Sequence, residues 1–327
     1  MTRRITGALF AAVLAFLLLP RAFPAVAVFV RLHVARPLAA FAGSLSARVS
    51  FPLAGYFTIL AALIIAALSL LSFRSPRAAR GLAALLCALL CAYWAMWGSL
   101  YACPAARADV LSNQALSRLC RRLIDEADMA MTQAAPEGDL ERLLETGCAL
   151  MRAQTGLPLS PAKAARHPGL LTRLGLAGLY FPFTGESIVN PEDCPDTLPF
   201  TICHELAHQA GVAREDEASY CAFLACETSE SALFRYSACF TALLYAMKSL
   251  RAADRADWLN TLSRMSDALY GRFVRANGLA AALPGGAQQG LTDVFLRLNG
   301  DPDGISSYER VLPLLAAHWR IDAGAGQ

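Results

Sequence analysis

Two uninterrupted apolar stretches in the first third of the chain constrain its fold more than any other feature. Residues 51–73 and residues 81–103 each lack a charged side chain. A transmembrane helix needs about 20 consecutive apolar residues, so each stretch is long enough to cross a bilayer. The whole chain is 56% hydrophobic, which is too apolar for an ordinary water-soluble protein. The sequence therefore predicts a membrane protein.

A third apolar stretch precedes these two. Residues 5–19 are uncharged but short, and they span a bilayer only if the helix continues past Arg21 into the segment Phe23–Val30. A cleaved signal peptide is the alternative interpretation, but the two spans that follow favour an uncleaved helix. We expect a membrane domain of three transmembrane helices at residues 1–103 and a second domain at residues 104–327.

Arginines beside the predicted spans indicate how the chain is oriented. Basic residues in short loops next to membrane spans lie in the cytoplasm. The arginines that precede the first span or lie between the second and third are Arg3, Arg4, Arg74, Arg77 and Arg80. They place everything after Cys103 outside the cytoplasm. The first loop opposes this orientation with Arg21, Arg31, Arg36 and Arg48. We expect a multi-pass protein of the cell membrane with an extracytoplasmic second domain.

The second domain contains an HExxH motif formed by His204, Glu205 and His208. On an α-helix, residues four apart lie one turn apart on the same face, so both imidazoles can bind one Zn²⁺. Glu205 occupies the position at which zinc peptidases carry the carboxylate that takes a proton from water. The spacing predicts a zinc site with Glu205 as the catalytic base.

The sequence around the motif fits a short helix followed by an acidic one. Pro199 suits the first turn of a helix, and Gly211 suits the position just after its end. A second helix begins near Arg214 and carries acidic residues in its first turn.

A catalytic zinc ion needs a third protein ligand and one open position. The longer motif HExxHxxGxxH would place that ligand at Arg214, whose guanidinium offers no lone pair to a metal. We therefore expect a glutamate on the following helix. Glu217 is preferred, because the segment from Glu217 to Ala222 resembles the E-A-x-x-x-A ligand helix of compact zincins, and Glu215 is the alternative.

The remainder of the second domain predicts a mainly helical fold with a small β-hairpin. Residues 139–153, 254–278 and 288–299 have helical patterns, and residues 176–190 read as two strands joined by a turn. Zinc peptidases commonly place an edge strand above the zinc helix, where a peptide can add as a further strand. The apolar stretch Ala232–Leu250 contains Arg235 and is predicted to be a buried helix, not a fourth span.

A tetrahedral intermediate needs a partner for its oxyanion besides the metal. The candidates are Tyr308, Tyr220, Tyr180 and His318, and Tyr308 is preferred because it precedes the last helix. The ten cysteines contain no C-x-x-C pair, so no second metal site is expected. The net charge is +3 without a concentrated basic patch, so no nucleic-acid partner is expected.

The three spans, the stretch Phe181–Glu186, the box at His204–His208 and the acidic helix at 215–218 together resemble a family of bacterial membrane proteins, domain of unknown function 3810, with zincin-like character. Tyr308 also fits this resemblance. It implies a membrane-tethered metallopeptidase with a zincin-like domain of α+β class, and it implies no particular substrate.

Two hypotheses follow from these features. The first is a membrane-anchored, zinc-dependent peptidase that hydrolyses a peptide or protein substrate with metal-activated water. The alternative is a non-catalytic membrane protein whose zincin-like domain binds a partner. Charged residues such as Asp193 and Glu217 lie on both sides of the HExxH motif. Charged side chains are costly within a bilayer, so these residues argue against an intramembrane protease.

Overall fold

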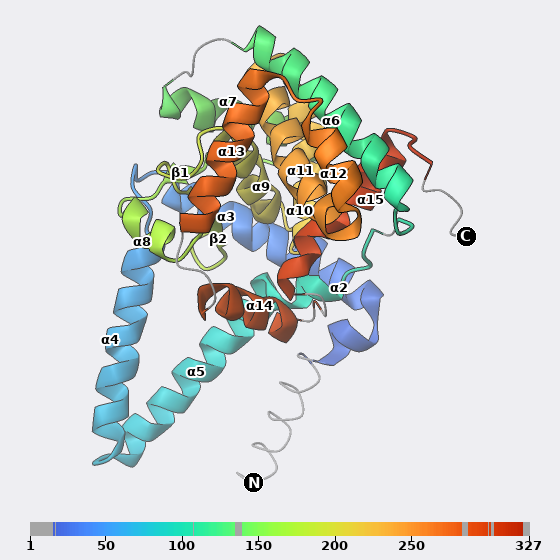
Figure 1. The fold of residues 1–327 in the computed structure, drawn as a ribbon. Coiled ribbons are helices and arrows are strands. Elements are labelled where there is room, and N and C mark those ends of the chain that lie inside the picture. The colour runs from blue at the N-terminus through green and yellow to red at the C-terminus, as the bar shows by residue number, and fades with distance from the viewer. Residues whose placement is uncertain are drawn as a thin grey trace.

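The protein consists of a helical domain and a pair of long helices that project from one side of it (Figure 1). This computed structural model describes residues 16, 18–106, 108–134, 139–282, 287–299, 301 and 304–322. The expected fold class, mainly helical with a small sheet, is confirmed.

Three segments are long and apolar enough to cross a membrane: Pro24–Ser46 (23 residues), α4 at Ala54–Ser72 (19 residues) and α5 at Pro76–Met96 (21 residues). The first consists of α2 (Pro24–Val30), a π-helical turn η1 (Arg31–Ala35) and α3 (Arg36–Ser46). The predicted span at residues 5–19 lies almost wholly outside the described residues.

The predicted span at residues 51–73 coincides with α4, whereas the one at residues 81–103 is displaced. Helix α5 begins at Pro76, where Ser75 caps it, and it ends at Met96. The short 3₁₀ helix η2 (Gly98–Ala102) follows and is buried against the domain. Apolar composition alone could not separate the spanning helix from the buried turn, because both environments favour the same residues.

The core of the domain surrounds α9 (Leu198–Gln209), whose twelve residues are all buried. The other helices that build this core are α6 (Asn113–Gln133), α7 (Leu140–Thr155), α10 (Glu215–Glu227), α11 (Ala232–Ala253) and α15 (Val311–His318). Helix α11 confirms the expected buried helix, and it is not among the candidate spans of the described chain. The remaining helices are α8 (Pro168–Arg173), α12 (Arg255–Leu262), α13 (Asp267–Ala282), α14 (Ala287–Asn299) and η3 (Gly304–Arg310).

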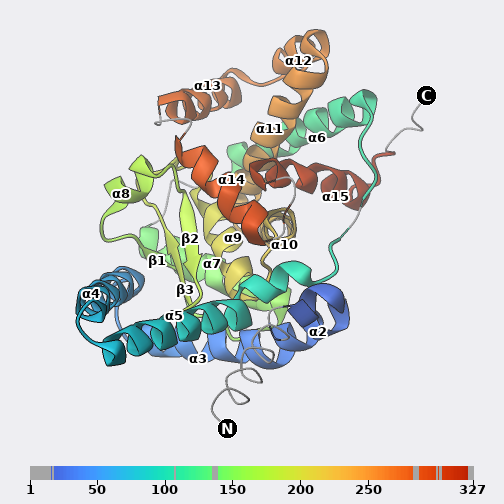
Figure 2. The same cartoon turned by 90° about the horizontal axis from the view of Figure 1, so that it is seen from below.

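A three-stranded sheet lies against α9 with the strand order β1-β3-β2. Strands β2 (Gly178–Phe181) and β3 (Glu186–Val189) form the expected antiparallel hairpin. Strand β1 (Lys163–Ala164) pairs with β3 in parallel and was not predicted, because two residues give no readable alternation. Strand β2 therefore forms one edge of the sheet (Figure 2). Both β2 and β3 contact α9.

The turn of the hairpin packs against α3. Gly185 has a φ of 65°, and a Cβ atom there would lie 2.5 Å from the backbone nitrogen of Gly43. Only glycine allows both this left-handed backbone and this close approach. The turn thereby ties the sheet to the segment that precedes α4.

A buried ion pair makes the second tie between the sheet and the membrane helices. The Lys163 ammonium donates to a Glu186 carboxylate oxygen at 2.7 Å and to the backbone oxygens of Ser46 and Phe51. The same carboxylate accepts from the backbone nitrogen of Ala54 at 2.8 Å, at the first turn of α4. A carboxylate at this position accepts hydrogen bonds from N–H groups that have no partner within the helix. Its negative charge also interacts favourably with the positive end of the helix dipole.

We expect the variant Glu186→Leu to be strongly destabilised. The substitution leaves the Lys163 ammonium buried without its counter-ion and removes the acceptor at the start of α4. Loss of one partner of a buried ion pair costs about 3–5 kcal/mol. Thermal unfolding of the purified protein in detergent, followed by circular dichroism, should show Tm lower by about 10 °C.

The control is Glu126→Leu, which breaks a partly exposed pair with Arg122 on the surface of α6. Such pairs contribute at most about 1 kcal/mol. Equal losses of Tm in the two variants would contradict the role given to Glu186.

Candidate metal centre

Helix α9 presents the two histidines of the HExxH motif on one face. Pro199 lies in its first turn, and Gly211, with a φ of 83°, lies just beyond its end, as expected from the sequence. The ring centroids of His204 and His208 are 4.6 Å apart. Both imidazoles are buried, which fixes their positions before any ligand binds.

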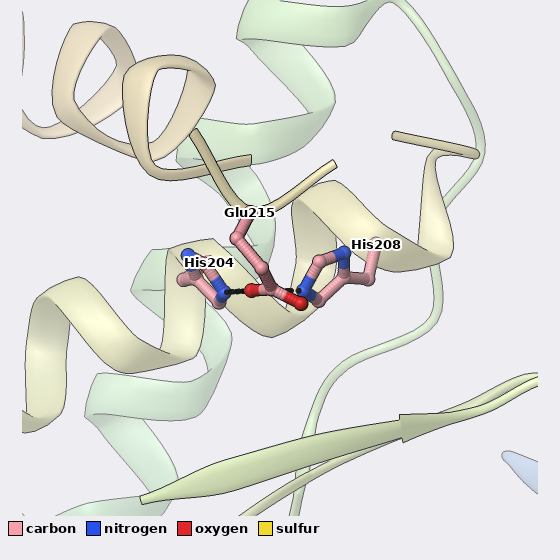
Figure 3. Close-up of side chains that lie close together, drawn as sticks. All are labelled: His204, His208 and Glu215. Atoms are coloured by element: carbon pink, nitrogen blue, oxygen red, sulfur yellow. Dashed lines mark hydrogen bonds and ion pairs between the residues drawn. The ribbon is translucent and has the colours of Figure 1, made fainter. Parts of the chain in front are cut away.

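Glu215, the first residue of α10, completes a group of three side chains that could hold a metal ion (Figure 3). One carboxylate oxygen of Glu215 lies 3.1 Å from Nε2 of His204 and 3.4 Å from Nε2 of His208. The ligand atoms of the three residues lie within 4.8 Å of one another. The turn at Gly211 brings α10 back over α9, and this reversal places Glu215 opposite the histidines.

The other nitrogen of each imidazole also has a partner. Nδ1 of His208 lies 2.7 Å from the carbonyl oxygen of Val212, to which it donates. Nδ1 of His204 lies 3.2 Å from the hydroxyl of Ser219. When the proton is on Nδ1, the Nε2 lone pair of each ring is free to bind a metal ion between the ring and Glu215. This is the tautomer that a metal-binding histidine needs.

The three side chains fit a zinc ion. Zn–N and Zn–O bonds of about 2.0–2.2 Å in a tetrahedron separate the ligand atoms by about 3.3 Å. The two measured separations of 3.1 Å and 3.4 Å bracket this value. Two imidazoles and one carboxylate form the ligand set of catalytic zinc sites that keep the fourth position for water.

Glu217, the preferred third ligand from the sequence, lies outside this group. Its carboxylate accepts a hydrogen bond of 2.6 Å from the backbone nitrogen of Ala106. Two residues along a helix correspond to about 200° of rotation, so Glu217 faces away when Glu215 faces α9. The alternative third ligand, Glu215, is the one that joins the histidines. Ser219 could have indicated it, because Ser219 follows Glu215 by four residues and shares its face.

Glu205 lies beside His204, His208 and Glu215, and one of its carboxylate oxygens accepts no hydrogen bond from the described residues. Its Oε2 atom is buried and has no partner among the described residues. A Cβ atom at Gly178 would lie 2.7 Å from Oε1 of Glu205, so strand β2 packs directly on this carboxylate. Burial raises the pKa of Glu205 to about 8. A carboxyl group with this pKa can accept and return a proton near neutral pH.

The ionisation of the histidines depends on Glu215. Burial disfavours charge on His208, but the Glu215 carboxylate and other nearby acceptors raise its pKa to about 9. Burial and the charge on His208 lower the pKa of His204. The two histidines together outweigh burial and lower the pKa of Glu215 well below its usual range.

Tyr308 is the oxyanion candidate whose ring contacts a histidine of the cluster. Its ring stacks on His204 with a centroid distance of 6.3 Å, and burial followed by the charge of Glu215 raises the pKa of its phenol well above the usual value. Arg310 holds this segment by bonding to Asp301 and to Asp216, the neighbour of Glu215.

The other oxyanion candidates differ in position. Tyr180, on strand β2, lines the cavity in front of the histidines. His318 lies elsewhere with its ring 2.7 Å from a Glu227 carboxylate oxygen, and Tyr220 packs beside it.

Sequence reasoning missed Tyr101, whose buried hydroxyl has no partner among the described residues and which lines the same cavity. Tyr101 lies within the predicted span at residues 81–103, and nothing in that apolar stretch indicates a site.

A cavity of about 330 Å³ lies in front of the cluster. Strand β2 and Leu174, which follows α8, line part of this cavity, and Phe295 and Leu296 of α14 line another part. Its lining is otherwise apolar and aromatic, including Trp97, so the polar groups converge at the histidines. The cavity is large enough for a few residues of an extended peptide.

Comparisons with known proteins place most of the chain in one family. Residues 33–316 match the family described as "Protein of unknown function (DUF3810)". No curated protein and no solved structure matches the chain.

We expect Glu215→Ala to reduce zinc affinity by about 100-fold or more, because it removes one of three ligands. Glu217→Ala is the matched control, since it removes a glutamate two residues away that lies outside the cluster. Competition with a chelator and zinc content per chain measure both. A loss of zinc in Glu217→Ala with retention in Glu215→Ala would contradict this ligand set.

Zinc affinity should rise with pH. Below pH 9 the metal must displace a proton from His208, whose pKa is raised to about 9 in the metal-free protein. Displacement of one proton raises the affinity about tenfold per pH unit, here between pH 7 and pH 9. The slope should fall above pH 9, once His208 is neutral. Chelator competition at fixed ionic strength measures this, and a constant affinity over that interval would contradict the assigned protonation.

Proposed function

The chain belongs to the DUF3810 family of proteins of unknown function, and we propose that it is a membrane-anchored, zinc-dependent peptidase. His204, His208 and Glu215 would hold the metal. Glu205 would act as general base and Tyr308 as the donor to the oxyanion. The substrate would be a peptide or protein segment bound in the cavity between β2 and α14.

The observation that carries this proposal is the position and burial of Glu205. Its Oε2 atom is buried without a partner beside three metal-binding side chains. A structural zinc site takes four protein ligands and has no use for an additional carboxylate. An unpaired buried acceptor costs free energy, so a function that needs it explains its presence better than stability does.

The proposed reaction uses few groups of the chain. When bound, zinc supplies an acidified water molecule and an electrophile for the carbonyl oxygen of the substrate. Glu205 would take the proton of the attacking water and return it to the leaving amine. Tyr308 would donate a hydrogen bond to the oxygen on which negative charge develops, and its raised pKa keeps the phenol protonated.

Strand β2 offers a means to align a peptide. In an antiparallel pair, every second residue of a strand directs its backbone N–H and C=O groups toward the partner strand. Ala177 bonds to Asn190, so Leu179 also faces β3, and the backbone groups of Gly178 and Tyr180 point to the free edge. In the described part of the chain, these groups have no partner outside the sheet. An extended substrate could add to this edge as a further strand, with its scissile bond beside Glu205.

The non-catalytic alternative keeps the fold and uses the cavity only for partner binding. It explains the membrane helices and the apolar cavity walls, but it gives no role to the unpaired Glu205 oxygen. We therefore favour the peptidase.

The membrane helices support an extracytoplasmic site. Helices α4 and α5 project from the domain and meet at their far ends (Figure 1). Arg74 lies in the turn that connects them, and Arg77 and Arg80 lie in the first turns of α5. Basic residues in such a short loop favour the cytoplasmic side. The domain at the opposite ends of both helices would then lie outside the cytoplasm, in a multi-pass arrangement.

The variant Glu205→Gln tests the proposal. Loss of the general base should lower the rate of peptide hydrolysis by about 10²–10⁴-fold, whereas zinc content should stay unchanged because Glu205 is not a ligand. A library of quenched fluorescent peptides with the zinc-loaded protein in detergent provides the assay. Hydrolysis at the wild-type rate in Glu205→Gln would remove Glu205 from the mechanism.

A further inference from the structure

Exposed apolar side chains flank the mouth of the cavity on two sides. We call this set the apolar rim, and it consists of Leu170, Leu174, Val294, Phe295 and Leu298. Their exposed fractions run from 40% for Leu174 to 74% for Leu298. Leu174 and Phe295 also line the cavity itself, so the rim is continuous with the site. Large apolar side chains gathered around an opening mark a surface that contacts something other than water.

The α8 side of the rim is held at the start of membrane helix α4. Leu171 packs with Ala54, the first residue of α4, in a small apolar cluster. Arg166, just before α8, donates to the Tyr56 hydroxyl at 3.1 Å and lies over the Phe51 ring. Leu170 on α8 and Leu174, the residue that follows α8, therefore lie at the level where α4 leaves the domain.

The α14 side of the rim is held at the end of membrane helix α5. The Tyr93 hydroxyl donates to the Asn299 side chain at 2.6 Å, and Leu296 packs in one cluster with Trp97. Val294, Phe295 and Leu298 lie at spacings of one and four residues, on the face of α14 that is exposed. Helix α14 thus lies at the level where α5 enters the domain (Figure 1).

Aromatic residues gather at this same level of both membrane helices. Phe51 and Tyr56 lie at the start of α4, and Tyr93 and Trp94 lie in the last turn of α5. Tyrosine and tryptophan concentrate at the boundary between lipid headgroups and acyl chains. Figure 2 views the domain from the side to which α4 and α5 project, and α14 and β2 are visible on this side. Residues of both elements line the cavity.

We propose that the apolar rim inserts into the bilayer interface, so that the cavity opens at the membrane surface and accepts segments of membrane-anchored polypeptides next to their anchor. The bilayer is favoured as the occupant because the rim is continuous with two helices that are long and apolar enough to span it. The substrate class rests on the proposed function, whereas the position of the rim does not.

The position of the rim is tested by fluorescence without any measurement of activity. A dansyl-bearing amino acid is incorporated at position 298, and in a matched variant at position 259, where Leu259 of α12 is 53% exposed and distant from α4 and α5. Each protein is reconstituted into phosphatidylcholine vesicles with or without brominated acyl chains. Insertion to about 5–10 Å predicts at least about twofold quenching at 298 and little at 259. Equal emission at 298 with and without bromine would overturn the insertion.

The substrate class is tested with one peptide sequence that the enzyme cleaves in the library. The peptide is presented either free in solution or attached to a transmembrane helix in the same vesicles. Confinement near the site should raise kcat/KM for the anchored form by about tenfold or more. Leu298→Asp places a charge on the rim outside the site and should remove this advantage while cleavage of the free peptide is unchanged.

The outcomes separate the two ideas. Cleavage of both forms at equal rates, unaffected by Leu298→Asp, would overturn the substrate class and leave the peptidase intact. Cleavage of neither form would contradict the proposed function and, with it, the substrate class. The fluorescence measurement decides the position of the rim in either case.

Discussion

The buried pair of Lys163 and Glu186 is the contact on which the arrangement of domain and membrane helices depends. It joins strands β1 and β3 to the loop before α4, and its carboxylate also caps α4. Buried ion pairs often add little net stability, but removing one partner is costly, so the pair specifies one arrangement. Because β3 pairs with β2 and β2 packs on Glu205, the membrane anchor and the candidate base belong to one connected unit.

The site shows how far local sequence patterns determine which side chains lie together. The proximity of His204 and His208 could be predicted because their spacing acts within one helix, and the position of Gly211 because glycine is common just after a helix end. The hairpin at 176–190 and the buried α11 were readable for the same reason. The choice between Glu215 and Glu217 could not be predicted from the sequence. It depends on which face of α10 the turn at Gly211 directs toward α9.

Other features depend on contacts between distant segments. Lys163 and Glu186 read as ordinary charged residues until the parallel pairing of β1 with β3 brings them together. The position of Tyr101 beside the cavity could not be predicted, because a membrane span and a buried turn have the same apolar composition. Strand β1 is too short for any periodic signal. In each case the environment of these residues depends on contacts between segments that are distant in the sequence.

The bonds of Arg310 to Asp216 and Asp301 have a consequence for the order in which the site forms. A chain is synthesised from its amino end, so Tyr308 and Arg310 are made after every other residue of the site. Helices α4 and α5 and both histidines already exist when this segment emerges. The three side chains of the cluster are thus made early, whereas the phenol that would stabilise the oxyanion under the proposed function is made last. Under the proposed function, competence for the reaction would then follow the synthesis of both membrane helices instead of preceding it.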